Sequence, residues 1–235
     1  MKTICYVDGY NLFYGCLKHS QDKWLDLYKL LYQQIIYPQN PKSQLVKIKF
    51  FTADIKAKIA THGQDANEAQ QAYHRALEKC YPDTIEIIKG YYSLEKAELL
   101  AYQNPPDKQN RVEVWRLEEK QTDVNIAVHA YRDAIKGDAE QLVFVSNDTD
   151  LEPALSMIRQ DMGDTVKMGV IFPIRQQEGL ERRPPNGRLS KYTDWTRRYI
   201  TAEELAASHL PLKIPTNKKT IFKPTYWSVA RNSHE

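Results

Sequence analysis

The sequence predicts an α/β fold in which helices cover both faces of a mostly parallel sheet. Short apolar runs alternate with helical patterns over about 170 residues, as expected for repeated strand–helix–strand units. The runs at residues 3–7 and 142–145 are continuously apolar, as in strands that are buried on both faces. Both runs end at polar, turn-forming residues. We therefore expect a three-layer, Rossmann-like domain.

The expected elements follow in a regular order. Residues 3–7 form the first strand, and a helical stretch follows from residue 12 to residue 35, ending before Pro38. The loop at residues 101–110 contains Pro105 and Pro106. Further strands are expected at 45–53, 84–92, 111–117, 141–145 and 165–172, and further helices at 65–80, 122–135 and 150–162.

The pattern becomes less regular after Pro173. Residues 176–186 are polar and are expected to form a mobile loop. Short elements are expected at 187–193, 195–200 and 202–208. Three prolines favour an extended final segment, namely Pro211, Pro215 and Pro224. We therefore predict one domain over residues 1–210, followed by a basic extended tail over residues 211–235.

Charge is unevenly distributed along the chain. The formal net charge is +3. Residues 175–198 carry seven basic and three acidic side chains, and residues 213–235 carry five basic and one acidic. The rest of the chain is therefore net negative, by five charges. Such asymmetry suggests a polyanionic partner near an acidic site, although a solvated tail on an ordinary surface is an equal alternative.

Cysteine usage and hydropathy predict a soluble cytoplasmic protein. The three cysteines, Cys5, Cys16 and Cys80, show no CxxC or Cys/His spacing, which favours reduced thiols. The apolar start of the chain ends at Asp8 and is too short for a signal peptide. No apolar run approaches the roughly 18 residues that a membrane span needs. We expect no membrane partner, and the sequence leaves open whether the chain forms a homo-oligomer.

Four aspartates are expected to meet at one edge of the sheet. Asp8 follows the first strand, while Asp148 and Asp150 follow the strand at 141–145. The carboxyl ends of parallel strands are where such a sheet binds its ligand. Asp123 lies in the first turn of the helix at 122–135, inside its apolar arc, so its carboxylate is expected to face the sheet. An inward carboxylate is costly unless it is paired, hydrogen-bonded or bound to metal.

Structural roles explain part of this pattern. Asp8 and Gly9 form a common turn, and Asn11 and Thr149 are suited to cap helices. Acids in a first helical turn also compensate the helix dipole. These roles leave Asp148 unexplained, because two carboxylates two residues apart repel each other unless a cation lies between them. His129 is expected on the polar, solvated side of its helix.

An all-oxygen ligand set selects Mg²⁺ or Mn²⁺ rather than Zn²⁺. The hypothesis is that the four aspartates hold one or two such ions and that a metal-bound water attacks a phosphodiester. Asn11 and Ser146 would orient the water or the phosphate. Lys120 would offset charge on the phosphate, although a plain surface lysine is equally compatible with the sequence.

Three ordered motifs resemble the NYN domain of the PIN-like nuclease superfamily, in its bacterial LabA-like branch. They are the stretches at residues 7–11, 118–125 and 145–151, and residues 189–211 resemble the end of bacterial members. The resemblance implies a PIN-type sheet, a Mg²⁺ or Mn²⁺ site and ribonuclease activity. It points to the four aspartates, with Asn11 and Ser146 beside them. Many relatives have glycine where this chain has Asn147, and Glu118 and Glu119 remain alternatives for the further glutamate of typical members.

The sequence-based prediction is therefore a metal-dependent endoribonuclease with RNA as its partner. Basic residues would grip RNA through its phosphates, namely Lys120, Arg182, Arg183, Arg197, Arg198, Lys218 and Lys219. One alternative is an RNA-binding or scaffolding module whose metal site is idle. A second is a phosphatase of the haloacid-dehalogenase type, suggested by Asp148-Thr149-Asp150, although Glu152 stands where that family has Thr or Val.

Overall fold

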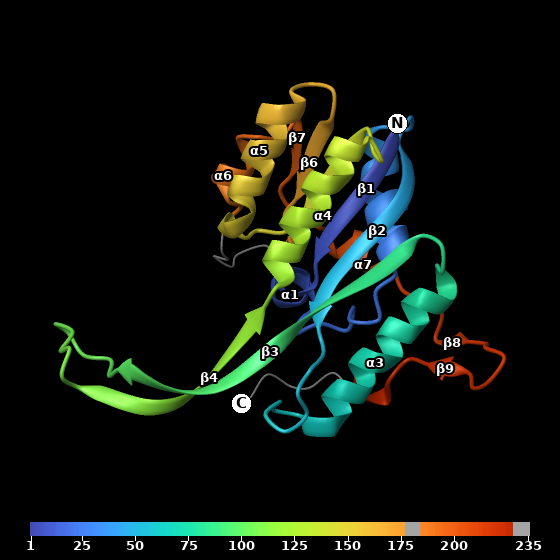
Figure 1. Cartoon of the computed structure of the whole chain (residues 1–235). Helices are drawn as coiled ribbons and strands as arrows, with labels where there is room; N and C mark the ends of the chain where they lie inside the picture. The colour runs from blue at the N-terminus through green and yellow to red at the C-terminus, as the bar shows by residue number, and fades with distance from the viewer. Residues whose placement is uncertain (177–183, 228–235) are drawn as a thin grey trace.

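A seven-stranded sheet with the order β4-β3-β2-β1-β5-β6-β7 forms the centre of the protein (Figure 1). The computed structural model describes residues 1–176 and 184–227. All neighbouring strands of the sheet pair in parallel except β3 and β4. The strands are β1 Lys2–Asp8, β2 Gln44–Ala53, β3 Ile85–Leu100, β4 Arg111–Lys120, β5 Gln141–Val145, β6 Lys167–Ile171 and β7 Trp195–Arg197.

Helices cover both faces of this sheet (Figure 1). The helices on one face, together with the C-terminal segment, enclose a core around Val7 and Ile48, and α4 and α5 enclose a second core around Tyr6 and Phe144. This confirms a three-layer α/β architecture. The helical elements are α1 Gly9–Leu12, η1 Phe13–Leu17, η2 Lys29–Ile36, α2 Tyr37–Gln39, α3 Gly63–Cys80, α4 Thr122–Lys136, η3 Thr149–Leu151, α5 Glu152–Met162, α6 Gly187–Ser190, α7 Ala202–Ala206 and η4 Thr225–Trp227.

The chain reverses its direction of winding between β1 and β5. It adds β2 and β3 on one side of β1, then returns to place β5 and β6 on the other. Val7 at the end of β1 pairs with Val145 at the end of β5. The ends of these strands therefore flank a topological switch point, where open α/β sheets bind their ligands.

The first helical region differs from the prediction. The expected continuous helix at residues 12–35 is divided by a loop in which Trp24 and Leu25 are fully buried. The indole Nε1 of Trp24 donates to the carbonyl oxygen of Pro211 over 2.9 Å, so this loop anchors the C-terminal segment. The helical conformation also continues past Pro38 into α2, which ends one residue later at Gln39.

β3 is longer than expected and runs on into a projecting hairpin. It pairs antiparallel with β4 over ten residue pairs, from Tyr91 with Lys120 to Leu100 with Arg111. The ribbon extends well away from the body of the protein (Figure 1). Residues 101–110 form its tip, as the prolines predicted. We call residues 91–120 the hairpin arm.

The C-terminal segment packs on the domain. β8, Lys213–Ile214, and β9, Ile221–Phe222, form a small antiparallel hairpin beside α3 (Figure 1). Ile214 and Ile221 are buried, and Trp227 packs edge-on against Trp24. The mobile loop expected at 176–186 lies largely outside the described residues. Within the described residues, no helix is long and apolar enough to cross a membrane.

Candidate functional site at the carboxyl edge of the sheet

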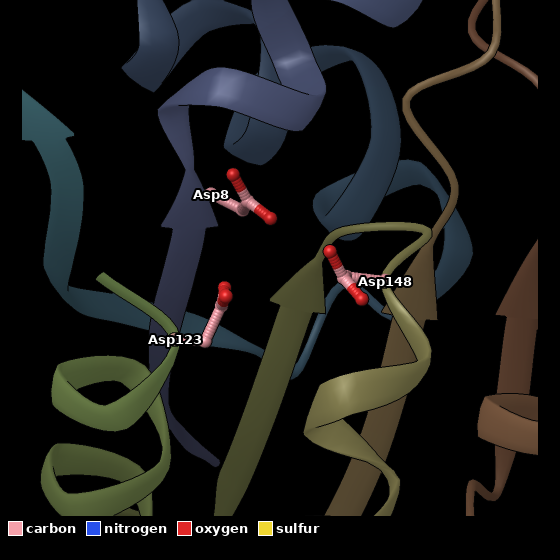
Figure 2. A group of neighbouring side chains, drawn as sticks. All are labelled: Asp8, Asp123 and Asp148. Atoms are coloured by element: carbon pink, nitrogen blue, oxygen red, sulfur yellow. The ribbon is translucent and has the colours of Figure 1, made fainter. Parts of the chain in front are cut away.

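Three carboxylates converge at the switch point. Asp8 ends β1, Asp148 follows β5, and Asp123 lies in the first turn of α4 (Figure 2). One carboxylate oxygen from each residue lies within 4.8 Å of the other two. Side chains from three segments thus meet as the sequence predicted, and their spacing would allow them to hold a cation. We call Asp8, Asp123 and Asp148 the acid cluster.

Asp8 is held rigidly by its neighbours. Its Oδ1 accepts the backbone N–H of Asn11 over 2.9 Å, and its Oδ2 accepts the Asn11 side-chain amide over 2.6 Å and the Ser146 hydroxyl over 2.8 Å. Burial raises the pKa of Asp8, and these hydrogen bonds oppose that rise. Gly9 is required beside it, because a Cβ at this position would lie 2.6 Å from the carbonyl oxygen of Phe51.

Asp123 shows the strongest electrostatic coupling of the cluster. Its pKa is raised to about 6, first by burial and then by the negative charges of Asp8, Asp148 and Asp150. Like charges held close together disfavour ionisation of one another. The cluster therefore favours a ligand that donates hydrogen bonds or carries positive charge at this position.

Asp150 lies at the margin of the cluster. It is exposed, and its backbone N–H donates to Oδ1 of Asp148 over 3.0 Å, so Asp148 caps the short helix η3. The capping expected of Thr149 is thus made by Asp148. Asp150 contributes charge to Asp123 but does not belong to the three carboxylates that meet.

The structure distinguishes the two glutamates that end β4. Their side chains point to opposite faces of the strand, as alternation requires. Glu118 pairs with Lys120 and Arg116. Glu119 is half-buried, accepts the Thr122 hydroxyl over 2.5 Å, and has a pKa raised by burial and then by Asp123. Glu119 is therefore the glutamate beside the acid cluster.

Asn147 is a further site residue that the sequence did not single out. It is buried, and its amide nitrogen donates to the carbonyl oxygen of Pro184 over 3.2 Å. Its Oδ1 accepts the backbone N–H of Asn186 over 2.8 Å. Asn147 thus fastens the segment before α6 to the carboxyl end of β5. The two partners lie 37 and 39 residues further along the chain, so no local sequence pattern could reveal the contact.

The helix face containing Asp123 is oriented differently from the prediction. His129 was expected to be solvated, but its ring packs against Phe51 at a centroid distance of 5.7 Å and its Nδ1 lies 3.4 Å from Nζ of Lys49. The buried face of α4 includes Asp133, which accepts hydrogen bonds from Lys49 and from Tyr6. On a helical wheel Asp133 lies beside Ile126, and its ion pair with Lys49 extends the buried face of α4 toward His129.

Two of the basic residues expected to bind RNA are paired with glutamates in the structure. Lys120 pairs with Glu118, and Arg197 pairs with Glu204. Arg198, Lys218 and Lys219 are exposed, the last two on the β8–β9 hairpin. Lys219 lines a groove of 790 Å³ between α3 and the C-terminal segment, which contains no residue of the acid cluster. Arg182 and Arg183 lie outside the described residues.

Comparison with known proteins identifies a close relative. The chain is 40% identical, over 97% of its length and 75% of the relative's, to 6-hydroxy-3-succinoylpyridine 3-monooxygenase HspA of Pseudomonas putida. This chain belongs to the HspA family. No protein-family model matches it. A solved structure of a protein of unknown function from Vibrio parahaemolyticus is 17% identical, with a TM-score of 0.47, over 86% of this chain and 92% of that one.

The relationship to HspA corrects the functional prediction. HspA is named as a monooxygenase, which is an oxidoreductase, so the metal-dependent ribonuclease assignment is wrong. The predictions of RNA hydrolysis and of a Mg²⁺ or Mn²⁺ cofactor are therefore both wrong. The error arose because clustered carboxylates at a switch point serve many chemistries on this kind of fold. The resemblance of the three motifs to the NYN domain stays a prediction.

Flavins supply the redox chemistry of many monooxygenases, and a flavin dinucleotide makes specific demands on this edge of the sheet. Dinucleotide sites of Rossmann type place a glycine-rich turn after the first strand, where a helix N-terminus faces the pyrophosphate. Here β1 ends at Asp8 and is followed by Gly9-Tyr10-Asn11, and the carboxylates of the acid cluster occupy that position. Negative charge there repels a pyrophosphate. The residues of the switch point therefore do not fit a flavin dinucleotide.

Proposed function

We propose that this protein is a monooxygenase that acts on a hydroxylated pyridine bearing an acidic side chain. The observation that carries the proposal is 40% identity to HspA along almost the whole chain. A monooxygenase transfers one atom of O₂ to its substrate and reduces the other to water, with electrons from an external donor. In the substrate named for HspA, the ring hydroxyl at position 6 lies para to position 3, which carries the succinoyl chain.

The acid cluster supports this substrate class. A 6-hydroxypyridine presents an O–H group, or the ring N–H of its pyridone form, along one edge of the ring. Carboxylates accept hydrogen bonds from such groups, and a bond to a charged acceptor is roughly twice as strong as a neutral one. The fixed position of Asp8 between Asn11 and Ser146 would orient the ring without any movement of the protein. We assign the acid cluster to the polar edge of the ring.

Substrate consumption tests this proposal. The purified protein is mixed with 6-hydroxy-3-succinoylpyridine and reduced nicotinamide, with and without added flavin, and O₂ uptake is followed. We expect substrate-dependent O₂ uptake that Asp148→Asn lowers by about 10- to 100-fold in kcat/KM, the effect of losing one charged hydrogen bond. Asp138→Asn, on an exposed aspartate away from the cluster, is the matched control. Absence of substrate-dependent uptake under all these conditions would refute the proposal.

A further inference from the structure

A row of aromatic and basic side chains leads away from the acid cluster. Tyr10, Tyr14 and Lys18 are spaced four residues apart along α1 and η1, so they lie on one side of the helical segment. The rings of Tyr10 and Tyr14 are 4.4 Å apart between centroids, and Nζ of Lys18 lies 4.8 Å from the centroid of Tyr14. We call these three residues the tyrosine row.

The row is exposed at its surface and supported from behind. Tyr10 and Tyr14 are 45% and 50% exposed, while Phe13 packs edge-on against Tyr14 and joins the core beneath it. Tyr92, at the base of the hairpin arm, is close enough that Tyr10 and Tyr14 contribute to its raised pKa, after burial and Glu119. The two tyrosine rings are half-exposed and held in place by a core, so their edges can pack against the face of a flat ring.

Charge changes sign along the row. Tyr10 is two residues from Asp8, and its pKa is raised by burial, then by Tyr14, Glu119 and Asp8. The other end of the row carries the ammonium group of Lys18, which is exposed. Tyr14 contacts both other members, since its ring centroid lies 4.4 Å from that of Tyr10 and 4.8 Å from Nζ of Lys18. Acidic groups therefore lie at one end of an aromatic surface and a cation at the other.

We infer that the tyrosine row is the binding track for the aromatic substrate and that Lys18 binds the carboxylate of its side chain. This rests on the proposed substrate class. The ring would pack against the exposed edges of Tyr10 and Tyr14, with its hydroxyl edge toward the acid cluster. The para side chain would then extend toward Lys18, since the cluster repels its carboxylate. Lys18 would thus select substrates with an acidic chain opposite the hydroxyl.

Paired ligands test the role of Lys18. Binding is measured by calorimetry for 6-hydroxy-3-succinoylpyridine and for 2-hydroxypyridine, which lacks the acidic chain. Lys18→Gln should weaken binding of the first about tenfold, the loss of a charge-assisted hydrogen bond, and leave the second unchanged. Tyr14→Leu should weaken both. Lys136→Gln, which removes an exposed positive charge at the far end of α4, should weaken neither.

The outcomes separate this inference from the proposed function. Equal affinities of wild type and Lys18→Gln for the acidic ligand would overturn the assignment of Lys18, as would equal losses for both ligands. Selective loss in Lys18→Gln would support the track even if wild type showed no O₂ uptake, in which case the monooxygenase proposal alone would fail. Normal turnover with an unchanged KM in Lys18→Gln would overturn the binding track but leave the monooxygenase proposal standing.

The hairpin arm carries a second, independent inference. An isolated two-stranded ribbon is only marginally stable in water. One face of this ribbon nevertheless presents Leu94 opposite Leu117, and Trp115 opposite Lys96. Trp115 is 72% exposed and Leu117 48% exposed. Apolar side chains on a projecting element indicate a surface that is covered by a partner.

Charge on the arm indicates which partner. Residues 91–120 carry five basic and six acidic side chains, interspersed along both strands. Lys96 and Glu113 lie beside Trp115 and form an ion pair at 2.6 Å. A mixed, nearly neutral surface is complementary to itself under a two-fold axis, and it does not suit a polyanion. We propose that the Trp115 face of the arm binds the same face of a second copy of this chain.

Sedimentation equilibrium tests this association. Wild type should be a dimer, and Trp115→Glu should shift it to a monomer with unchanged circular dichroism. Leu212→Glu is the control, because Leu212 is 69% exposed on the C-terminal segment. A monomeric wild type would overturn the proposal. A dimeric Trp115→Glu, checked with Leu117→Glu as a second variant, would do the same.

Discussion

Lys49 on β2 donates to Oδ2 of Asp133 on α4 over 2.6 Å, and both side chains are almost fully buried. The Tyr6 hydroxyl donates to the same oxygen over 2.7 Å. This network joins β1, β2 and α4, the element that presents Asp123. Breaking a buried ion pair leaves an uncompensated charge in the core.

We predict that Asp133→Asn lowers the free energy of unfolding by about 3 kcal/mol, because Lys49 would lose its buried counter-charge. Chemical denaturation at neutral pH measures the change. The double variant Lys49→Met, Asp133→Leu should recover most of the loss, since it removes both charges. Equal stability of Asp133→Asn and wild type would show that water or another group satisfies Lys49.

His74 makes the protein sensitive to acid. It is buried against Phe50, and burial, then the charge of Lys89, lowers its pKa from 6.5 to about 4. The unfolded chain takes up a proton below about pH 6.5, whereas the folded protein resists protonation until about pH 4. The stability contributed by neutral His74 is therefore complete above pH 6.5 and lost as the pH falls through 4.

The full loss is of order 3 kcal/mol, from 1.36 kcal/mol per pKa unit. We predict that His74→Leu flattens the dependence of unfolding free energy on pH between 6.5 and 4. Denaturant titrations at a series of pH values measure the slope. His62→Leu, in an exposed histidine, should leave the slope as it is in wild type. A slope that is the same in wild type and His74→Leu would contradict the assignment.

Asn147 should hold the segment around Pro184 and Asn186 in place. Asn147→Ala removes its hydrogen bonds to Pro184 and Asn186 and is expected to lower kcat/KM about tenfold if that segment borders the substrate. Limited proteolysis should then cut near residue 184 faster than in wild type. An unchanged cleavage rate would show that other contacts hold the segment.

Much of the fold could be predicted from the sequence because its central strands are buried on both faces. Residues 141–145 form β5 as expected, and the apolar start of the chain forms β1. The hairpin arm was missed because β3 continues beyond the sheet into solvent. There, both faces of the strand are exposed, so apolar and polar residues need not alternate. The divided first helix and the buried Asp133 depend on tertiary contacts that local patterns do not contain.

The convergence of three of the four aspartates was predicted, but the activity assigned to them was wrong. The positions of the strand ends and the inward face of α4 predicted that Asp8, Asp123 and Asp148 lie together, and the structure places them within reach of one ion. Their residue types, however, do not distinguish phosphodiester hydrolysis from oxygenation. The spacing of Tyr10, Tyr14 and Lys18 was visible in the sequence, but its relevance to a ring-shaped substrate arises only beside the relationship to HspA.

Isotope labelling tests the central claim most directly. The protein is incubated with 6-hydroxy-3-succinoylpyridine and reduced nicotinamide under ¹⁸O₂, and the organic product is analysed by mass spectrometry. The account predicts one ¹⁸O atom in the product, and none when ¹⁸O is supplied only as water. Substrate conversion without ¹⁸O from O₂, or no conversion at all, would contradict assignment as a monooxygenase of this substrate class.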